Sequence, residues 1–473
     1  MTDANDIARK RGPAALRKTI DKGALTRPPA FSEEALAWQF AERHGDDWRF
    51  VAVWGKWLSY DGMHWRADET LEVFHLVRQI CREAAAECRG KGLAKSIASA
   101  GTVAAVERLA RSDRRLAATA EQWDQDLRAL NTPAGVADLR TGALRPHRAA
   151  DYMTKLAGTG PDPTCPTTAW LQFLDRVCGQ NAELIAFLQR VAGYSLTGST
   201  AEHALFFLFG TGANGKSTFV NALMSAWGDY HKTSPIETFT ASNSDRHPTD
   251  LAGLRGARLV TSVETEEGRR WAESKIKSLT GGDRISARFM RQDFFEFTPT
   301  FKLVVAGNHK PGLRSVDEAI RRRFHLVPFT VTIPVDERDE GLGEKLKAEL
   351  PGILAWAIQG CLEWQATGLM PPPAVRDATA NYLEAEDALA AWIEDAGERD
   401  PDVFETSQAL YRSWKSWCDR TGEHAGSLKK FSQRLEDRGA SIGIQKGRDA
   451  NGLRGFCGLR VTKPDLVSEV GEA

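Results

Sequence analysis

The sequence predicts an α/β protein whose central part is a mainly parallel sheet with helices on both faces. Residues 201–333 contain four short, nearly continuous apolar runs, at 204–209, 259–263, 303–306 and 326–329, and segments of helical periodicity separate them. Strands that are apolar on both faces indicate a buried, helix-covered parallel sheet. The first run continues into a glycine-rich loop and a helix-compatible stretch, which is the order of elements at a phosphate-binding turn.

The chain of 473 residues is too long for one hydrophobic core, so several domains are expected. We predict a flexible arm at 1–30, a mainly helical α+β domain at 31–200, the sheet domain at 201–370, a linker with a small basic domain at 371–463, and a tail at 464–473. The net charge of −1 argues against a protein that coats DNA with its whole surface. Local positive charge would still suffice to line a DNA channel.

The sequence also excludes some classes of protein. It contains no apolar run of about 18 residues, so neither a membrane span nor a membrane partner is expected. The polar, basic N-terminal segment lacks the apolar core of a secretory signal, which favours a cytoplasmic protein. Seven dispersed cysteines without a C-x-x-C pair predict inert thiols rather than a zinc ribbon or a redox motif.

Residues 210–218 match the phosphate-loop motif G-x-x-x-x-G-K-[ST] in full. They are Gly210, Thr211, Gly212, Ala213, Asn214, Gly215, Lys216, Ser217 and Thr218. Glycines allow the backbone N–H groups of such a loop to surround an anion. Lys216 would reach the β- and γ-phosphates of ATP, and the Ser217 hydroxyl would hold Mg²⁺. The alternative is a glycine-rich turn that binds nothing, and it is the weaker interpretation of a complete motif.

Polar residues follow the second and third predicted strands. Glu264 follows the strand at 259–263, and Glu266 lies two residues later. A carboxylate at the end of a buried parallel strand can hold Mg²⁺ or polarise the attacking water, although these acids could also begin the next helix. Asn308 follows the strand at 301–306, where it could sense the γ-phosphate or form a turn. The sequence after Asn308 is not the N-K-x-D that recognises guanine, which disfavours a GTPase.

Three consecutive arginines at 321–323 follow these motifs. Consecutive residues point in different directions on a helix, so the three cannot share one partner. In a ring-shaped ATPase, Arg322 or Arg323 could reach the γ-phosphate of the neighbouring subunit as an arginine finger. The alternative is a solvated basic helix end.

A basic hairpin is predicted between the second and third strands. Arg288, Phe289, Met290 and Arg291 lie near its tip, and their mixture of positive charge and apolar surface suits single-stranded DNA. Lys275 and Lys277 precede the hairpin and are further candidate DNA contacts. The alternative is an ordinary hairpin with exposed arginines.

The order of these motifs is specific: a phosphate loop, an acidic strand end, K-x-K-x-L-T-G-G-D, a basic hairpin, G-N-H-K-P, and D-E-A-I-x-R-R. Over about residues 35–460, and most strongly over 201–333, the chain resembles the superfamily III helicases. The closest resemblance is to the phage/plasmid primase–helicase family, which includes the poxvirus uncoating-factor-type ATPase. The resemblance implies an AAA+ core, a hexameric ring, dependence on ATP and Mg²⁺, 3′→5′ unwinding, and a location in the cytoplasm of a bacterial host.

The same resemblance assigns roles to particular residues. Glu264, with Glu266, takes the Walker B role that holds Mg²⁺ and activates water, and Asn308 is the sensor. Arg322 or Arg323 is the finger, and the hairpin contacts DNA in the channel. Because the acids form E-T-E rather than an adjacent pair, the acid that activates water stays open.

Residues 31–200 resemble the helicase-associated domain of this family, most clearly in L-N-T-P-A-G-V-A-D-L-R-T-G at 130–142. Many relatives carry a primase-polymerase domain further upstream. Only about 30 residues precede the resemblance here, so we expect no priming activity and a separate primase or loader as a possible partner.

The segment at 406–463 has twelve Lys or Arg and five Asp or Glu residues. Two predicted helices followed by a glycine-rich stretch suggest a winged helix. Lys429, Lys430 and Arg434 on its second helix and Lys446 and Arg448 on its wing are candidate DNA contacts. The alternative is a protein-docking domain.

The sequence as a whole predicts an ATP-dependent DNA helicase of phage or plasmid replication that forms a homo-oligomeric ring and acts on single-stranded and forked DNA. Two alternatives stay open: an NTPase that remodels nucleic-acid complexes without unwinding, and an origin-binding initiator that uses ATP only to assemble. A small-molecule kinase is disfavoured because no acceptor site can be named.

Overall fold

The computed structural model describes residues 28–241, 249–263, 269–290, 293–313, 316–400, 403–423, 425–439, 443–449 and 452–461. The chain divides into two compact units. The first extends to Asp138 and includes Ala143–Gly160, and the second comprises Leu139–Gly142 and the chain from Pro161 onward. The division therefore falls near residue 160, whereas the sequence suggested residue 200. Most of the expected N-terminal arm and the whole C-terminal tail lie outside the described residues.

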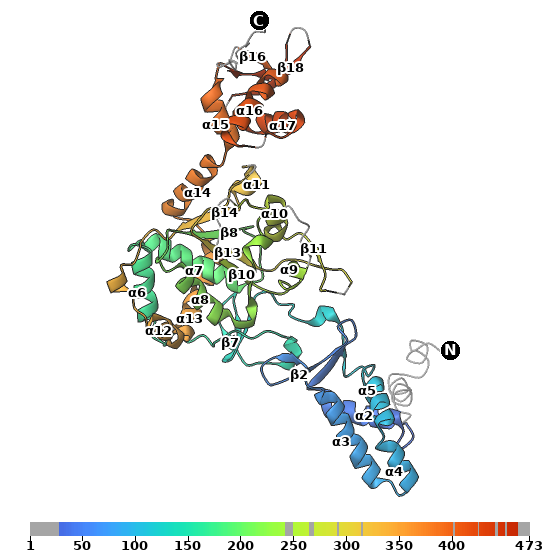
Figure 1. Cartoon of the computed structure of the whole chain (residues 1–473). Helices are drawn as coiled ribbons and strands as arrows, with labels where there is room; N and C mark the ends of the chain where they lie inside the picture. The colour runs from blue at the N-terminus through green and yellow to red at the C-terminus, as the bar shows by residue number, and fades with distance from the viewer. Residues whose placement is uncertain are drawn as a thin grey trace, which may run out of the picture. The chain divides into compact units, whose positions relative to one another are not determined.

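Within the described residues, the first unit combines α-helices with two small, mainly antiparallel sheets (Figure 1). Its helices are α2 (Glu33–His44), α3 (Glu72–Glu87), α4 (Lys91–Ile97) and α5 (Ala100–Ala110). One sheet has the order β3 (Trp65–Ala67), β2 (Lys56–Tyr60), β1 (Trp48–Val51) and β4 (Ala117–Ala118), and the other has the order β5 (Ala129–Thr132), β6 (Gly135–Asp138) and β7 (Leu144–Arg145). The apolar stripes of the helices pack on one side of the first sheet and form a core around Phe40, Trp57 and Val77.

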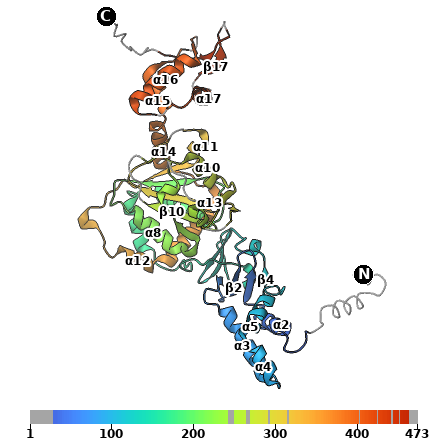
Figure 2. The same ribbon diagram turned by 45° about the vertical axis from the view of Figure 1, so that its right-hand side comes forward.

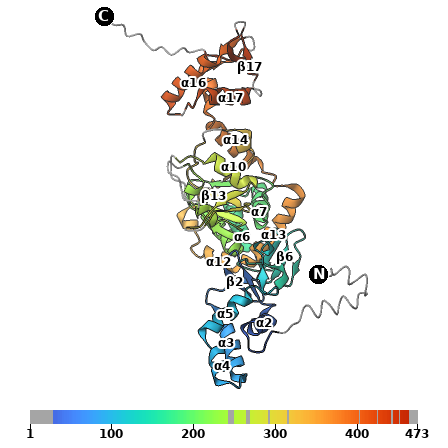
Figure 3. The same ribbon diagram turned by 90° about the vertical axis from the view of Figure 1, so that its right-hand side faces the viewer.

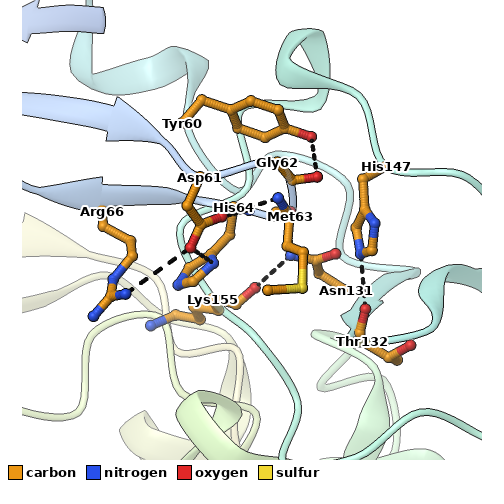
Figure 4. Close-up of polar contacts among 10 residues, drawn as sticks. All are labelled: Tyr60, Asp61, Gly62, Met63, His64, Arg66, Asn131, Thr132, His147 and Lys155. Atoms are coloured by element: carbon orange, nitrogen blue, oxygen red, sulfur yellow. Dashed lines mark hydrogen bonds and ion pairs between the residues drawn. The ribbon is translucent and has the colours of Figure 1, made fainter. Parts of the chain in front are cut away.

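Asn131 holds three segments of the first unit together (Figure 4). Its side chain is fully buried, and its Nδ2 donates hydrogen bonds to the carbonyl oxygens of Met63 and Lys155, each at 3.0 Å. Beside it, the imidazole of His147 lies 2.8 Å from the carbonyl oxygen of Thr132. The L-N-T-P-A-G motif therefore connects separate segments of this unit through hydrogen bonds, as is usual for buried polar side chains.

The second unit contains a five-stranded sheet with the order β14–β8–β13–β10–β9, in which every neighbouring pair is parallel. Its strands are β8 (Leu205–Phe209), β9 (His231–Thr233), β10 (Leu259–Val263), β13 (Lys302–Gly307) and β14 (Phe324–Pro328). The strand that comes first in the chain, β8, thus lies inside the sheet between the two that come last. In parallel sheets, ligands bind outside the carboxyl ends of strands where the order reverses, and β8 occupies such a position.

Helices cover both faces of this sheet (Figures 1–3). One face packs against residues of α10 (Glu273–Gly281), the β11 (Ile285–Ala287) and β12 (Phe295–Phe297) hairpin, and α14 (Pro373–Ala385). On the other face, Phe187 of α7 (Ala182–Leu196) contacts Phe206 and His325. The prediction of an α/β fold with a buried parallel sheet is therefore confirmed.

Further helices of the second unit lie between residues 168 and 367. They are α6 (Thr168–Val177), α8 (Lys216–Trp227), α9 (Thr249–Ala252), α11 (Glu318–Arg321), α12 (Leu342–Ala348) and α13 (Leu350–Thr367). Gly193 of α7 and Gly360 of α13 allow two helices to approach closely, because a Cβ at Gly193 would lie 2.0 Å from the Cys361 nitrogen. None of the helices within the described residues is both long and apolar enough to cross a membrane.

The C-terminal segment forms a separate hydrophobic cluster around Trp392, Trp414 and Phe431. Its elements are α15 (Ala388–Ala396), β15 (Gly397–Glu398), β16 (Phe404–Thr406), α16 (Ser407–Thr421), α17 (Leu428–Gly439), β17 (Gln445–Arg448), β18 (Arg454–Cys457) and β19 (Arg460–Val461). β17 and β18 form an antiparallel hairpin that extends to β16. The helices α16 and α17 thus precede the β17–β18 hairpin, in the order that the sequence of 406–463 suggested.

Candidate nucleotide-binding site

The loop between β8 and α8 is built from backbone conformations that favour glycine. Gly212, Ala213 and Gly215 have positive φ angles of 103°, 47° and 82°. A Cβ at Gly210 would lie 2.0 Å from the carbonyl oxygen of Phe329, so this position requires glycine. The loop therefore turns sharply at the carboxyl end of β8, as a phosphate-binding loop must.

The amino-terminal end of α8 faces this loop. The twelve-residue helix begins at Lys216, and its N-cap residue Gly215 provides no side-chain hydrogen bond. The first backbone N–H groups of a helix have no partner within the helix, and they carry partial positive charge. Ser217, in the first turn, is exposed and can present its hydroxyl to a ligand. These features suit an anion such as a nucleotide phosphate.

Lys216 is buried, with 6% of its surface exposed, and neutral oxygens surround its ammonium group. Its Nζ donates to the Gly210 carbonyl oxygen at 2.8 Å, to Asn214 Oδ1 at 3.0 Å and to Asn308 Oδ1 at 3.1 Å. Burial lowers the pKa of this ammonium group. A phosphate group would supply the negative charge that these oxygens lack, so the site fits the phosphates of ATP.

Asn214 ties the loop to the neighbouring strand. Its side chain is buried, its Oδ1 accepts from Lys216, and its Nδ2 donates to the Phe329 carbonyl oxygen at 2.8 Å. Phe329 directly follows β14, and its N–H donates to the Phe209 carbonyl oxygen at 2.8 Å. The motif alone did not assign Asn214 this bridging role, because Phe329 lies 115 residues away in the sequence.

The structure brings the predicted sensor Asn308 to the phosphate loop. Gly307 at the end of β13 pairs with Phe209 at the end of β8, so the next residue of each strand lies at the same edge. The contact between Asn308 Oδ1 and Lys216 Nζ follows from this register. Asn308, which the sequence could equally place in a turn, therefore belongs to the site.

The predicted acids Glu264 and Glu266 lie outside the described residues, and their roles stay predictions. The strand before them, β10, ends at Val263, which pairs with Ala306 of β13. Among the residues that the structure describes, no group of three or more His, Cys, Asp or Glu side chains could hold a metal ion. Of the two predicted Mg²⁺ ligands, Ser217 and Glu264, the described residues include Ser217, which is exposed.

The three arginines around the end of α11 have different surroundings. Arg323 is 6% exposed, and it donates to Thr280 Oγ1 at 3.1 Å and to the Ala319 carbonyl oxygen at 2.7 Å. Arg321 is partly buried and lies 3.4 Å from Asp387. Arg322 alone of the three is exposed. Of the two predicted finger residues, Arg322 can therefore reach outward, whereas Arg323 is held within its own subunit.

Lys277, a predicted DNA contact, pairs with a carboxylate of its own chain. Its Nζ lies 2.5 Å from Asp317 Oδ2, and Asp317 begins α11 as its N-cap residue. The sequence showed both residues but not their contact, since they are 40 positions apart. Lys275, the other predicted contact on α10, is partly buried.

The predicted hairpin is present as β11 and β12, and its tip is rich in apolar surface. Phe289 is 40% exposed, Met290 is 70% exposed and Phe294 is 58% exposed. The guanidinium carbon of Arg288 lies 4.7 Å from the centre of the Phe294 ring. Arg291 lies outside the described residues. Exposed aromatic rings beside a cation are suited to stacking on nucleobases, and the sequence analysis had not included Phe294.

The candidate DNA contacts on α17 differ in how far their side chains are exposed. Lys429 and Lys430 are exposed near its beginning. Arg434 is partly buried, and its guanidinium carbon lies 5.8 Å from the centre of the Trp414 ring. The two lysines are therefore the better placed for a ligand.

The two candidate contacts on the β17–β18 hairpin have partners within the chain. Lys446 Nζ lies 2.6 Å from Glu436 Oε2, and both side chains are about half-exposed. Arg448 donates to the Gly452 carbonyl oxygen at 3.3 Å. Exposed ion pairs of this kind are weak, so both side chains could still turn toward DNA.

The fold and the site together define an α/β protein with a candidate phosphate-binding loop at the carboxyl end of an inner strand of a parallel sheet. Residues 37–179 match a family described as D5 N terminal like, and residues 208–323 match a family of unknown function (DUF5906). The C-terminal region of NrS-1 has a similar fold, with a TM-score of 0.50 at 8% identity, covering 91% of this chain and 100% of that one.

Viral proteins are related in sequence. "Putative helicase 022R" of Frog virus 3 (isolate Goorha) is 26% identical over 288 residues, and the match covers 56% of this chain and 29% of that protein. "Putative helicase L207/L206" of Acanthamoeba polyphaga mimivirus is 26% identical over 264 residues, and the match covers 50% of this chain and 27% of that protein. The matches thus span less than a third of either relative. Together with the two family matches, they support a phage or viral superfamily III helicase-type protein, as the order of motifs predicts.

Proposed function

We propose that this chain is an Mg²⁺-dependent ATPase that moves on single-stranded DNA and unwinds forked duplexes. The observation that carries the proposal is the convergence of Lys216, Asn214 and Asn308 at the amino-terminal end of α8. A buried ammonium group among neutral oxygens at a helix start is prepared for a phosphate. Viral relatives named as helicases support the choice of DNA unwinding as the work done.

The proposed enzyme is a ring with an AAA+ core and a C-terminal winged helix. Each ATP would lie between two subunits, with Lys216 and Ser217 from one and Arg322 from the next. Glu264, with Glu266, would hold Mg²⁺ and activate water, and Asn308 would sense the γ-phosphate. The exposed Phe289, Met290 and Phe294 of the hairpin would contact the DNA strand. The 3′→5′ direction follows from the family resemblance.

The test is the ATPase rate with and without single-stranded DNA, together with unwinding of a forked duplex, for the wild-type protein and Lys216→Ala. DNA-stimulated hydrolysis and unwinding, both lost in Lys216→Ala, would support the proposal. Hydrolysis without unwinding would favour a remodelling ATPase. ATP-dependent assembly on DNA without hydrolysis would favour the initiator.

A further inference from the structure

Helix α10 holds the short helix α11 at both of its ends. Near the start of α11, Lys277 Nζ lies 2.5 Å from one carboxylate oxygen of Asp317, and the other oxygen accepts from the Ile320 N–H at 2.8 Å. About one turn further along α10, Thr280 Oγ1 accepts a hydrogen bond from Arg323 Nε at 3.1 Å. Two contacts from one helix therefore bracket the segment that contains Arg322.

External contacts must fix the direction of α11, because the helix has only four residues, Glu318–Arg321. So short a helix cannot stabilise itself through its own hydrogen bonds. Asp317 supplies the N-cap. Burial opposes ionisation of its carboxyl group, but the hydrogen bonds from Lys277 and the Ile320 N–H outweigh this effect and lower its pKa. Lys277 thus holds a cap that stays ionised.

Arg322 depends on this arrangement for its position. It is exposed, whereas Arg321 pairs with Asp387 and Arg323 is buried against Thr280. The backbone of α11 therefore sets where the Arg322 guanidinium can reach. Catalytic groups are sensitive to small displacements, and a shift of about 1 Å can lower a rate by about 100-fold.

We propose that Lys277 is a positioning residue for Arg322, acting through Asp317, and is not a DNA contact. The inference rests on the proposed function, in which Arg322 completes the ATP site of a neighbouring subunit. It replaces the role of DNA contact that the sequence suggested for Lys277, because its ammonium group pairs with the N-cap carboxylate of α11 in the same chain.

The first experiment compares full-length Lys277→Ala, Lys277→Arg and Asp317→Asn with the wild type. ATP turnover is measured without DNA, and DNA affinity is measured across a range of salt concentrations. Lys277→Ala should lower kcat about tenfold and leave KM for ATP within about twofold, because the loop that binds ATP is untouched. DNA affinity and its salt dependence should not change, since no phosphate contact is lost.

The other variants separate positioning from folding. Lys277→Arg keeps the ion pair and should restore turnover. Asp317→Asn keeps an N-cap side chain but loses the charge, so it should reproduce Lys277→Ala, and the double variant should be no worse than either single one. Lys345→Ala removes a matched ion pair, 2.6 Å from Asp339 in another part of the same unit, and should behave as wild type.

A mixing experiment tests the action on the neighbouring subunit. Lys277→Ala subunits keep an intact phosphate loop, and Lys216→Ala subunits keep a correctly held Arg322. Mixed assemblies should therefore hydrolyse ATP faster than the sum of the two separate preparations, since some interfaces combine the intact parts of both.

Three results would overturn the inference. Lys277→Ala with normal turnover and weaker, less salt-dependent DNA binding would make Lys277 a DNA contact. A loss of turnover that neither Lys277→Arg nor mixing restores would make its role purely structural. Absence of hydrolysis in the wild type would remove the proposed function, and this inference would fall with it.

Discussion

Two asparagines in this chain have different roles: Asn131 lies within β5, one residue before its end, and Asn308 directly follows β13. Asn131 is fully buried, and its Nδ2 donates to two backbone carbonyl oxygens. Asn308 is exposed, and its Oδ1 accepts from the buried ammonium group of Lys216. The Asn131 amide connects segments of the fold. The Asn308 amide contacts the ammonium group of Lys216, to which a phosphate could bind instead.

The two asparagines differ in whether a ligand could replace one of their hydrogen-bonded partners. A phosphate group could take the place of the neutral oxygens around Lys216 without unfolding the protein, because they lie at the carboxyl ends of β8 and β13. The partners of Asn131 are the backbone carbonyl oxygens of Met63 and Lys155, and these bonds join two other segments of the fold to β5. The environment of a polar side chain thus separates a binding group from a structural one, although the residue type is the same.

The largest effect is expected for Lys216→Ala. Loss of the ammonium group should abolish ATP turnover, because it removes the charge that stabilises the phosphates in the transition state. Stability should change little, because removing a buried charge that no carboxylate compensates offsets the loss of its three hydrogen bonds. Steady-state ATPase assays and thermal unfolding check both points. Turnover within a few-fold of wild type would remove the phosphate loop from the mechanism.

The next largest effect is expected for Arg322→Ala. In assembled protein it should lower turnover by about 1,000-fold with ATP affinity nearly unchanged, as for other arginine fingers. Arg323→Ala should instead lower thermal stability, because its guanidinium group is buried and hydrogen-bonded to Thr280 and Ala319. If Arg323→Ala unfolds like wild type and hydrolyses no ATP, the roles of the two arginines are reversed.

Sequence reasoning could predict the site where its residues are consecutive. The loop at 210–218 is recognisable from consecutive residues alone, although its contacts with Phe329 and Asn308 are not. The parallel sheet followed from apolar runs of strand length. Asn308 was a weaker prediction, because its role depends on the register of β13 beside β8. That register arises from packing between distant segments, and a local pattern does not specify it.

The choice among the arginines could not be predicted for the same reason. Thr280 lies 43 positions before Arg323, and Asp387 lies 66 positions after Arg321. These distant residues bury one guanidinium group and pair another, leaving Arg322 exposed. Likewise, α6 and α7 lie in the unit that contains the sheet, and their packing against distant segments is not visible in the local pattern that suggested a boundary at residue 200.

A smaller effect, on stability, is expected for Asn131→Ala. Two hydrogen bonds from a buried amide to backbone carbonyl groups are lost, which should destabilise the first unit by about 2 kcal/mol. Hydrogen exchange should increase in the peptides that contain β2, β5 and β6, while ATP affinity stays unchanged. Asn308→Ala should show the reverse pattern, with lower turnover and unchanged exchange. Equal effects of the two variants on stability would contradict the proposed difference.

The smallest effect concerns pH and tests burial in the sheet itself. His325 of β14 stacks on Phe206, with ring centres 5.4 Å apart, and burial lowers its pKa to about 4. In the unfolded chain this histidine takes up a proton near pH 6.5, whereas in the folded protein it stays neutral down to about pH 4. The free energy of unfolding is therefore highest above about pH 6.5 and decreases as the pH falls toward 4. At about pH 5.5, the loss should be about 1 kcal/mol.

His325→Phe retains the stacking ring without the ionisable group, and it should weaken the dependence of stability on pH. Unfolding by denaturant at about pH 7 and about pH 5.5 measures the difference for both proteins. His231, whose pKa burial also lowers to about 4, remains in the variant, so part of the dependence should persist. Because both histidines lie in the sheet of the second unit, the effect should appear there and not in the unit that Asn131 holds together. A variant with undiminished pH dependence would show that the His325 ring can be protonated without unfolding.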